Sequence, residues 1–128
     1  MPHTKVVFYR EPDGTVPVLD WLLTEVLRKD KKLFAWCFEA IEMLGEVGWD
    51  LRRPTAAPLR DDIYELRIKY YRQNYRILYF FHKGDIAVLA HGLTKESDVP
   101  DKYIDLAVYR KKKFTEDPKV HTYEEYDQ

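Results

Sequence analysis

Arginine, lysine and histidine residues recur in the most apolar part of the chain, at spacings that could hold an anion. Residues 63–93 read IYELRIKYYRQNYRILYFFHKGDIAVLAHGL, and their apolar and polar side chains alternate, which is typical of strands. Arg67, Lys69, Arg76 and His91 lie inside this run. Three cations and a histidine gathered on one surface would attract a phosphate or a carboxylate.

Three strands joined by two turns are expected to position these side chains. The alternation predicts strands over residues 63–70, 75–82 and 86–93, with turns at 71–74 and 83–84. Like charges that face each other on neighbouring strands destabilise a sheet by up to roughly 1 kcal/mol per pair. A cluster of cations in the middle of a sheet therefore favours a functional interpretation over a structural one.

The two turns also predict which side chains lie next to one another. With these turns, Lys69 lies opposite Arg76, and Arg76 lies opposite His91. Strand alternation then places Arg67, Lys69, Arg76 and His91 together on one solvent-facing surface. The alternative interpretation is an ordinary solvated sheet face. The other face is expected to form the core, and its side chains are Tyr64, Leu66, Ile68, Ile77, Tyr79, Phe81, Val88 and Ala90.

Helical patterns precede and follow this three-stranded segment. The predicted elements are a strand at 5–10, a helix from Pro17 with Thr15 as its N-cap, a helix at 30–47, a loop at 48–58, and a helix at 100–114. The order β-α-α-β-β-β-α predicts an α+β fold, with an antiparallel sheet and the helices, including the helical hairpin, packed on one face. Residues 1–115 would form a single domain, followed by an acidic tail at 116–128.

The composition narrows the class of protein. A length of 128 residues suits one domain, and 34% charged with 45% hydrophobic residues indicates a folded chain. The net charge is −1, but five acids lie in residues 116–128, and the rest of the chain holds 20 basic and 17 acidic residues. Such a balance permits nucleic-acid binding without requiring it.

The sequence disfavours disulfide-linked, secreted, membrane-spanning and metal-binding proteins. Cys37 is the only cysteine, so no intramolecular disulfide can form, and we expect it in the core of a helix. No segment has the composition of a signal peptide or a membrane span, which predicts a cytoplasmic protein. No Cys–His or His–carboxylate cluster has metal-ligand spacing, so no metal is expected.

Residues 59–114, LRDDIYELRIKYYRQNYRILYFFHKGDIAVLAHGLTKESDVPDKYIDLAVYRKKKF, resemble the RelE/HigB-like toxins of type II toxin–antitoxin modules, in the phage-derived HigB-like branch. The similarity is strongest in YELR, NYRILYF, HGLTK and P-x-x-x-I-x-x-A. It implies a RelE-like, microbial-RNase-like fold and an endoribonuclease that inhibits translation. In such toxins the 2′-OH of the mRNA attacks the adjacent phosphate, usually on the ribosome, with no metal or other cofactor. The implied partners are a cognate antitoxin protein and mRNA on the ribosome, with no membrane.

The resemblance also implies roles for individual cations. Arg67 of YELR and Arg76 of NYRILYF would clamp the reacting phosphate, and Lys95 of HGLTK would be a further phosphate contact. Preorganised cations stabilise the charge that develops on the phosphate in the transition state. The alternation of the strands places Arg67 and Arg76 together independently of the resemblance.

The remaining site residues carry alternative roles. His91 is the best candidate for proton transfer, because its unperturbed pKa near 6.5 suits a donor and an acceptor, although a strand histidine bonded to a neighbour is the alternative. Glu65 could act as a base or form a salt bridge within the patch. Tyr103 and Tyr109 could stack on a base or belong to the core. Lys69 would contact the substrate.

Two further functions remain open at this stage. The same fold could serve as a non-catalytic RNA- or protein-binding module, because binding needs only cations whereas cleavage also needs proton transfer. A small-molecule-binding protein that holds a phosphate or carboxylate on the patch is disfavoured, because the chain has no glycine-rich phosphate loop.

Overall fold

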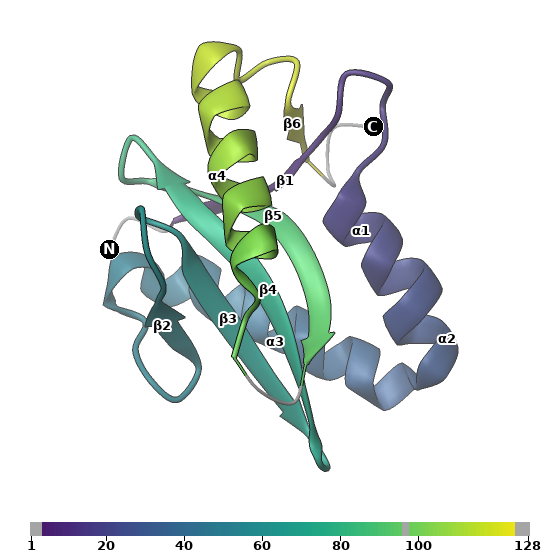
Figure 1. Ribbon diagram of the computed structural model, residues 1–128. Helices are drawn as coiled ribbons and strands as arrows, with labels where there is room; N and C mark the ends of the chain where they lie inside the picture. Colours follow the sequence, from purple (N-terminus) through teal and green to yellow (C-terminus); the bar gives the residue numbers. More distant parts are fainter. Residues whose placement is uncertain (1–3, 96–97, 125–128) are drawn as a thin grey trace.

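A six-stranded sheet forms the centre of the protein in the computed structural model, which describes residues 4–95 and 98–124 (Figure 1). The strands are β1 (Lys5–Tyr9), β2 (Ala56–Pro58), β3 (Tyr64–Tyr70), β4 (Gln73–His82), β5 (Ile86–Lys95) and β6 (Thr122–Tyr123). Their spatial order is β2-β3-β4-β5-β1-β6. Only the β1–β5 pair is parallel among the pairs of this sheet. The predicted α+β class with a mostly antiparallel sheet is confirmed.

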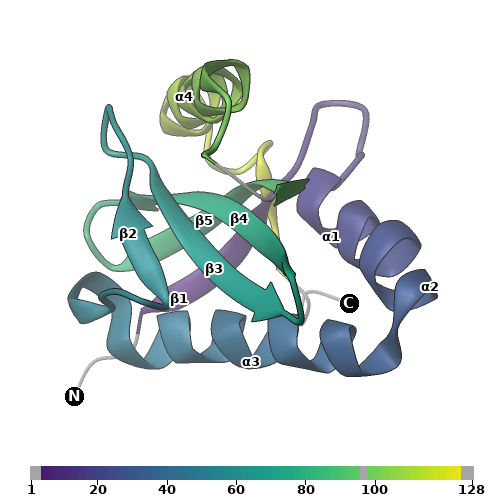
Figure 2. The ribbon, with the colours of Figure 1, turned by 60° about the horizontal axis from the view of Figure 1, so that its bottom comes forward.

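Helices cover both faces of the sheet. They are α1 (Pro17–Trp21), a π-helical turn (Leu22–Val26), α2 (Leu27–Lys29), α3 (Lys31–Val47) and α4 (Asp101–Glu116). The first three follow one another without a break and form a helical hairpin with α3, as predicted. Figure 2 shows this hairpin on one side of the sheet and α4 on the other. The expectation that every helix packs on one face is therefore wrong, because α4 buries its own apolar side chains, Ile104, Ala107 and Phe114, against the second face.

Asp30 separates the two arms of the hairpin. Its Oδ1 accepts hydrogen bonds from the backbone N–H groups of Lys32 at 2.7 Å and Leu33 at 3.4 Å, so it caps α3. Its Oδ2 accepts a hydrogen bond from the Tyr70 hydroxyl at 2.7 Å, which ties the hairpin to the end of β3. The hydrogen bond from Tyr70, followed by that from Lys32, lowers the pKa of the Asp30 carboxyl.

The start of the first helix differs from the prediction. Val16, not Thr15, occupies the N-cap position, and no side chain caps it, although Pro17 does stand in the first turn. Leu23 is apolar but is 44% exposed. It lies in the π-helical turn, whose wider spacing rotates the residues away from a regular α-helical stripe.

The pairing of β3 with β4 is shifted from the prediction because their turn is shorter than expected. Tyr70 pairs with Gln73, so only two residues form the turn, and Tyr71 takes a positive φ of 56° there. Arg67 rather than Lys69 therefore lies opposite Arg76. The shift is an even number of residues, so both arginines remain on one face.

A bulge in β5 changes the pattern of that strand. Leu78 of β4 pairs with His91 and Tyr79 pairs with Leu89, which leaves Ala90 as the extra residue. His82 pairs with Ile86, so the turn before β5 holds three residues rather than two and shifts the pairing by one residue, and the bulge shifts it by one more. Arg76 consequently lies opposite Leu93, not His91. Val88 lies between the turn and the bulge, where the longer turn alone has shifted the strand, so Val88 and Ala90 belong to the core beneath α4 and not to the hairpin-side core where they were expected.

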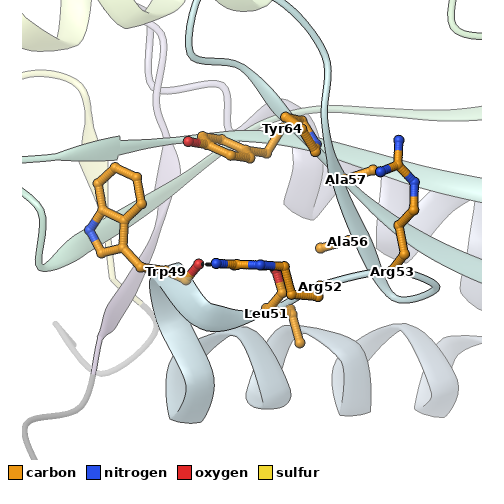
Figure 3. A pocket seen from close by; sticks show the side chains of 8 residues that line it. Trp49, Leu51, Arg52, Arg53, Ala56, Ala57 and Tyr64 are labelled. Atoms are coloured by element: carbon orange, nitrogen blue, oxygen red, sulfur yellow. Dashed lines mark hydrogen bonds between the residues drawn. The ribbon is translucent and has the colours of Figure 1, made fainter.

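The segment expected to be a loop at 48–58 contains two short elements. Gly48–Asp50 form a 3-10 helix, and β2 pairs with the first part of β3 as an edge strand. Figure 3 shows this region from close by. A three-residue strand that ends in Pro58 has too few alternating residues to be recognised in a sequence.

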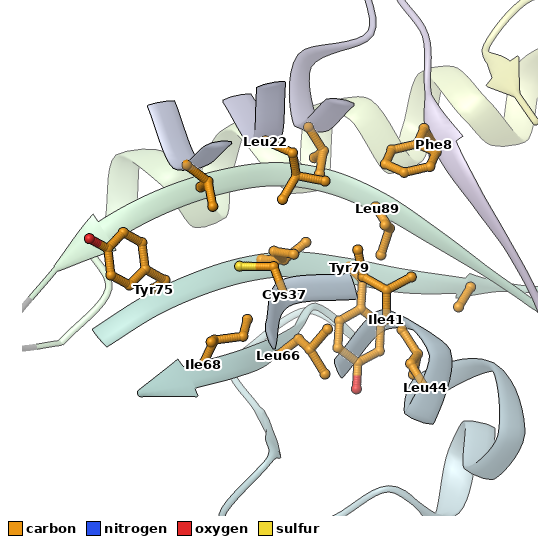
Figure 4. Close-up of a cluster of buried hydrophobic side chains, with 14 of the residues drawn as sticks. Phe8, Leu22, Cys37, Ile41, Leu44, Leu66, Ile68, Tyr75, Tyr79 and Leu89 are labelled. Carbon is orange, nitrogen blue, oxygen red and sulfur yellow. The ribbon is translucent and has the colours of Figure 1, made fainter. Parts of the chain in front are cut away.

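The hairpin-side core is apolar and includes the single cysteine. Figure 4 shows Cys37 among Leu22, Leu66, Tyr79 and neighbouring side chains. Burial raises the pKa of the Cys37 thiol to about 12, which keeps it protonated and unreactive at neutral pH. The predicted core position of Cys37 is confirmed.

Part of the C-terminal segment is attached to the sheet. Thr122 pairs with Tyr9 and Tyr123 with Phe8. His121 is buried, and its ring stacks on Tyr9 with centroids 5.1 Å apart. Although the sequence suggested no role for His121, its ring helps to hold β6 against β1.

Candidate functional site

Three rows of side chains cross β3, β4 and β5 on the face that α4 partly covers. Residues paired across antiparallel strands point to the same side of a sheet. The rows are Glu65–Leu78–His91, Arg67–Arg76–Leu93 and Lys69–Asn74–Lys95. Successive rows lie two residues apart, which is about 7 Å along a strand. The sheet therefore brings the predicted strand residues of the site together on one face.

α4 leaves part of this face uncovered. Figure 1 shows that α4 crosses β4 and β5 and that the sheet continues beyond the start of the helix towards the β3–β4 turn. The apolar side chains beneath α4 are those of the second core, among them Leu78 and Phe80. The row of Lys69 and Asn74 lies next to the turn, and Lys69 is exposed. The side chain of Lys95 is not among those that the structure describes.

A buried glutamate joins the two arginines of the site. The Arg67 Nη2 donates a hydrogen bond to Glu65 Oε2 at 2.9 Å. The Arg76 Nε forms an ion pair with Glu65 Oε1 at 2.8 Å. Side-chain exposure is 5% for Glu65, 10% for Arg76 and 34% for Arg67. The salt-bridge alternative for Glu65 is confirmed, whereas the expectation that Arg76 faces solvent is wrong.

The ion network explains how two opposed arginines are tolerated in a sheet. Arg67 and Arg76 face each other directly, and such a pair of like charges is unfavourable. Glu65 lies one row away on the same strand as Arg67 and reaches both guanidinium groups. Arg67 retains a buried Nε that has no hydrogen-bond partner in the described part of the chain. Of the two arginines, Arg67 is the more exposed and therefore the more available to an anion.

His91 lies at the edge of α4 and stacks on Tyr103. The ring centroids are 4.8 Å apart and the planes differ by 23°. Burial, and to a smaller extent the charge of Arg110, lowers the pKa of the His91 imidazole to about 4. His91 is therefore neutral at pH 7, when it can accept a proton.

Arg110 is a buried residue of the site region that the sequence analysis did not single out. Its Nη1 donates a hydrogen bond to the backbone oxygen of Ala90 at 2.6 Å, and its Nη2 forms an ion pair with Glu11 at 3.3 Å. Ala90 is the bulge residue next to His91, so Arg110 holds the backbone from which the His91 side chain projects. The signal was present in the sequence, because Arg110 lies in line with Ala107 and Phe114 on the apolar side of its helix.

Tyr109, which could stack on a base, and His82 both lie outside these rows. Tyr109 is exposed and carries Lys113 over its ring at 5.5 Å. His82 packs edge-on against Phe114 at 5.0 Å. In residues 4–95 and 98–124, no three His, Cys, Asp or Glu side chains come close enough together to bind a metal ion. Within the same ranges, no helix is both long and apolar enough to cross a bilayer.

Residues 25–112 match the protein family described as phage derived protein Gp49-like (DUF891). This stretch includes most of the helical hairpin, the strands from β2 to β5 and every residue of the three rows. The family is RelE-like and is associated with the toxins of toxin–antitoxin systems. A search of curated proteins found no match.

Proposed function

The chain belongs to the Gp49-like family, and on this premise we propose that it is the toxin of a type II toxin–antitoxin module and cleaves mRNA on the ribosome. The observation that carries the proposal is the three-row surface, in which Glu65 holds two arginines beside a neutral histidine. The site requires no metal in this proposal. The protein would act in the cytoplasm, where its partners are the cognate antitoxin and ribosome-bound mRNA.

In the proposed reaction, the phosphodiester lies over the arginine row. Arg67, Arg76 and Lys95 stabilise the negative charge that develops on the phosphate oxygens. The 2′-oxygen forms a bond to phosphorus while the bond from phosphorus to the 5′-oxygen breaks. The products are a 2′,3′-cyclic phosphate and a free 5′-OH; the leaving oxygen takes a proton from water, and the hydroxide that remains takes the proton accepted by His91.

His91 accepts the proton of the 2′-OH in this proposal. The imidazole is unprotonated at pH 7, as a general base must be, although the burial that lowers its pKa to about 4 also makes it a weaker base than an exposed histidine. The Tyr103 ring holds the imidazole by stacking, and it could also stack on a base of the RNA. Lys69 would contact a neighbouring phosphate, and Glu65 would keep both guanidinium groups in place.

Single-turnover cleavage of programmed ribosomes tests this function, with ribosome affinity measured separately. We expect His91→Gln to slow cleavage by about 10²–10⁴-fold, the usual contribution of a positioned acid or base, with little change in affinity. His82→Gln is the matched control, because His82 lies outside the three rows. Near-normal cleavage by His91→Gln would transfer the proton role to Glu65 or Tyr103.

A non-catalytic RNA- or protein-binding module is the second candidate. The low exposure of Arg76 and its ion pair with Glu65 favour it, because a compensated cation is less free to bind a transition state. No cleavage by the folded, unmodified protein would establish this candidate instead. Induced expression distinguishes the two in cells, since a toxin arrests growth and its antitoxin relieves the arrest.

A further inference from the structure

A cavity of about 510 Å³ lies on the hairpin side of the sheet, away from the three rows. It is bounded by the 3-10 helix at Gly48–Asp50, the loop that follows it, β2 and the start of β3. Its volume is in the range of small-molecule sites. Figure 3 shows Trp49, Arg52 and Tyr64 around one open space, with the small Ala56 at its back.

Two aromatic rings of this cavity are held in place. Trp49 is 52% exposed, yet its indole stacks on Phe81 at 4.4 Å and 12°, and its Nε1 donates a hydrogen bond to Gly84 O at 2.8 Å. Tyr64 stacks on Tyr79 at 5.5 Å and meets Trp49 edge to face at 6.2 Å. A planar ring could stack on one of these two rings with its edge towards the other, at little cost in side-chain ordering.

The charged residues of the cavity are both arginines. Among the eight residues that line it, Arg52 and Arg53 carry charge and none is acidic. The Arg52 Nη1 donates hydrogen bonds to the backbone oxygens of Trp49 at 2.6 Å and Leu51 at 3.4 Å, which hold its guanidinium against the backbone of the 3-10 helix. Arg53 is exposed. An anionic group would therefore meet two cations without competition from a lining carboxylate.

We infer that this cavity binds a nucleotide, with the base on the Trp49–Tyr64 rings and the phosphate at Arg52 and Arg53. Aromatic stacking combined with guanidinium groups is how proteins hold single nucleotides without reading their sequence. The ligand is either a free nucleotide or one unit of a single-stranded RNA. The inference goes beyond the proposed mRNA cleavage, because none of the residues that line the cavity belongs to the three rows.

Calorimetric titration of the purified protein with AMP tests the site. Binding should weaken by about tenfold or more in Arg53→Glu, which replaces a charge-assisted contact with a repulsion. Arg28→Glu is the matched control, since Arg28 is also exposed but lies in α2. Trp49→Leu should weaken binding by about fivefold to a hundredfold through loss of stacking. Circular dichroism and thermal melting establish that each variant is folded.

Further arms identify the source of the ligand and separate this site from the cleavage site. An RNA pentamer that binds more than about tenfold tighter than AMP identifies an RNA strand, and equal affinities identify a free nucleotide. His91→Gln should bind AMP normally, whether or not it cleaves RNA. No binding of AMP or the pentamer at millimolar concentration, or equal loss in Arg53→Glu and Arg28→Glu, overturns the inference. Binding only of an acidic peptide overturns it as well and makes the cavity a protein-docking site.

Discussion

Two pairs of arginines have different surroundings, one on the sheet face that α4 partly covers and the other in the loop before β2. Arg67 and Arg76 share the buried carboxylate of Glu65, which contacts both guanidinium groups within 3 Å (2.9 and 2.8 Å). Arg52 and Arg53 border a cavity whose lining residues include no acid. The charges of Arg67 and Arg76 are balanced by Glu65. No lining acid balances the charges of Arg52 and Arg53, so these two arginines are accessible to an anionic ligand.

The difference follows from burial. An uncompensated charge in the interior costs several kcal/mol, so an arginine that lies beneath other residues needs a partner. An exposed arginine remains hydrated and needs none. The compensated pair should therefore dominate stability, and the open pair should influence ligand affinity with little effect on stability.

Among these substitutions, neutralising Glu65 should cause the largest loss in the free energy of unfolding. In Glu65→Gln the two arginines face each other without a negative charge between them, and breaking such a buried pair costs about 3–5 kcal/mol. Urea denaturation at pH 7 measures this loss, with Glu39→Gln on the exposed side of α3 as the control. A loss below about 1 kcal/mol would mean that water screens the arginine pair.

Protonation of His91 should also destabilise the protein, by at most about 2 kcal/mol at the acid limit, because solvent screens part of the effect at this partly exposed ring. Its pKa is about 4 in the folded state against a normal 6.5, so the unfolded chain binds the proton more tightly. The contribution is fully present above pH 6.5 and is lost as the pH falls towards 4. The difference in free energy of unfolding between the unmodified protein and His91→Gln, measured across this range, isolates the effect. A constant difference would contradict the lowered pKa.

Arg110→Met should cost about 1–3 kcal/mol, because the buried oxygen of Ala90 loses its charged donor. The pKa of His91 should rise, since the repulsion from the Arg110 charge disappears. A pH titration of the imidazole by nuclear magnetic resonance measures the shift, and Lys112→Met on the exposed side of α4 is the control. An unchanged pKa would assign the depression to burial alone.

The smallest effect on stability is expected for Arg53→Glu, within about 0.5 kcal/mol. Arg53 is exposed, and within the described residues it has no ion pair that the substitution would break. The same urea denaturation measures the change, with Arg28→Glu beside it. A loss of stability comparable to that of Glu65→Gln would show that Arg53, like Arg67 and Arg76, depends on a compensating partner in the folded protein.

Much of the fold was predictable because the period of the apolar pattern carries it. The change from helical to strand spacing identified α3 and the strands β3, β4 and β5. The two-residue alternation placed Arg67 and Arg76 on one face even though their turn was predicted too long, since an even shift preserves the face. β2 and β6 were missed, because strands of three and two residues have no measurable period.

The sequence predicted which residues lie on the face of the candidate site, but not how deeply they are buried or how β5 pairs with β4. The sequence placed Arg67, Arg76 and His91 on one face, but His91 lies there only because the longer turn before β5 and the bulge at Ala90 each shift the strand by one residue. A bulge depends on the backbone and leaves no single-residue signature in this strand. The burial of Arg76 was missed because the strand pattern does not say on which face α4 will pack.

The helical hairpin packs against β5 at Gly92, where the indole of Trp21 lies close to the backbone. A Cβ added to Gly92 would collide with the indole of Trp21, since the nearest atoms all belong to that ring. The two residues are therefore complementary in size, and neither can change alone without opening a void or creating an overlap. Gly92→Ala should be tolerated best together with a smaller residue at position 21, as a non-additive pair in a double-mutant cycle. In related chains, the two positions are expected to vary together.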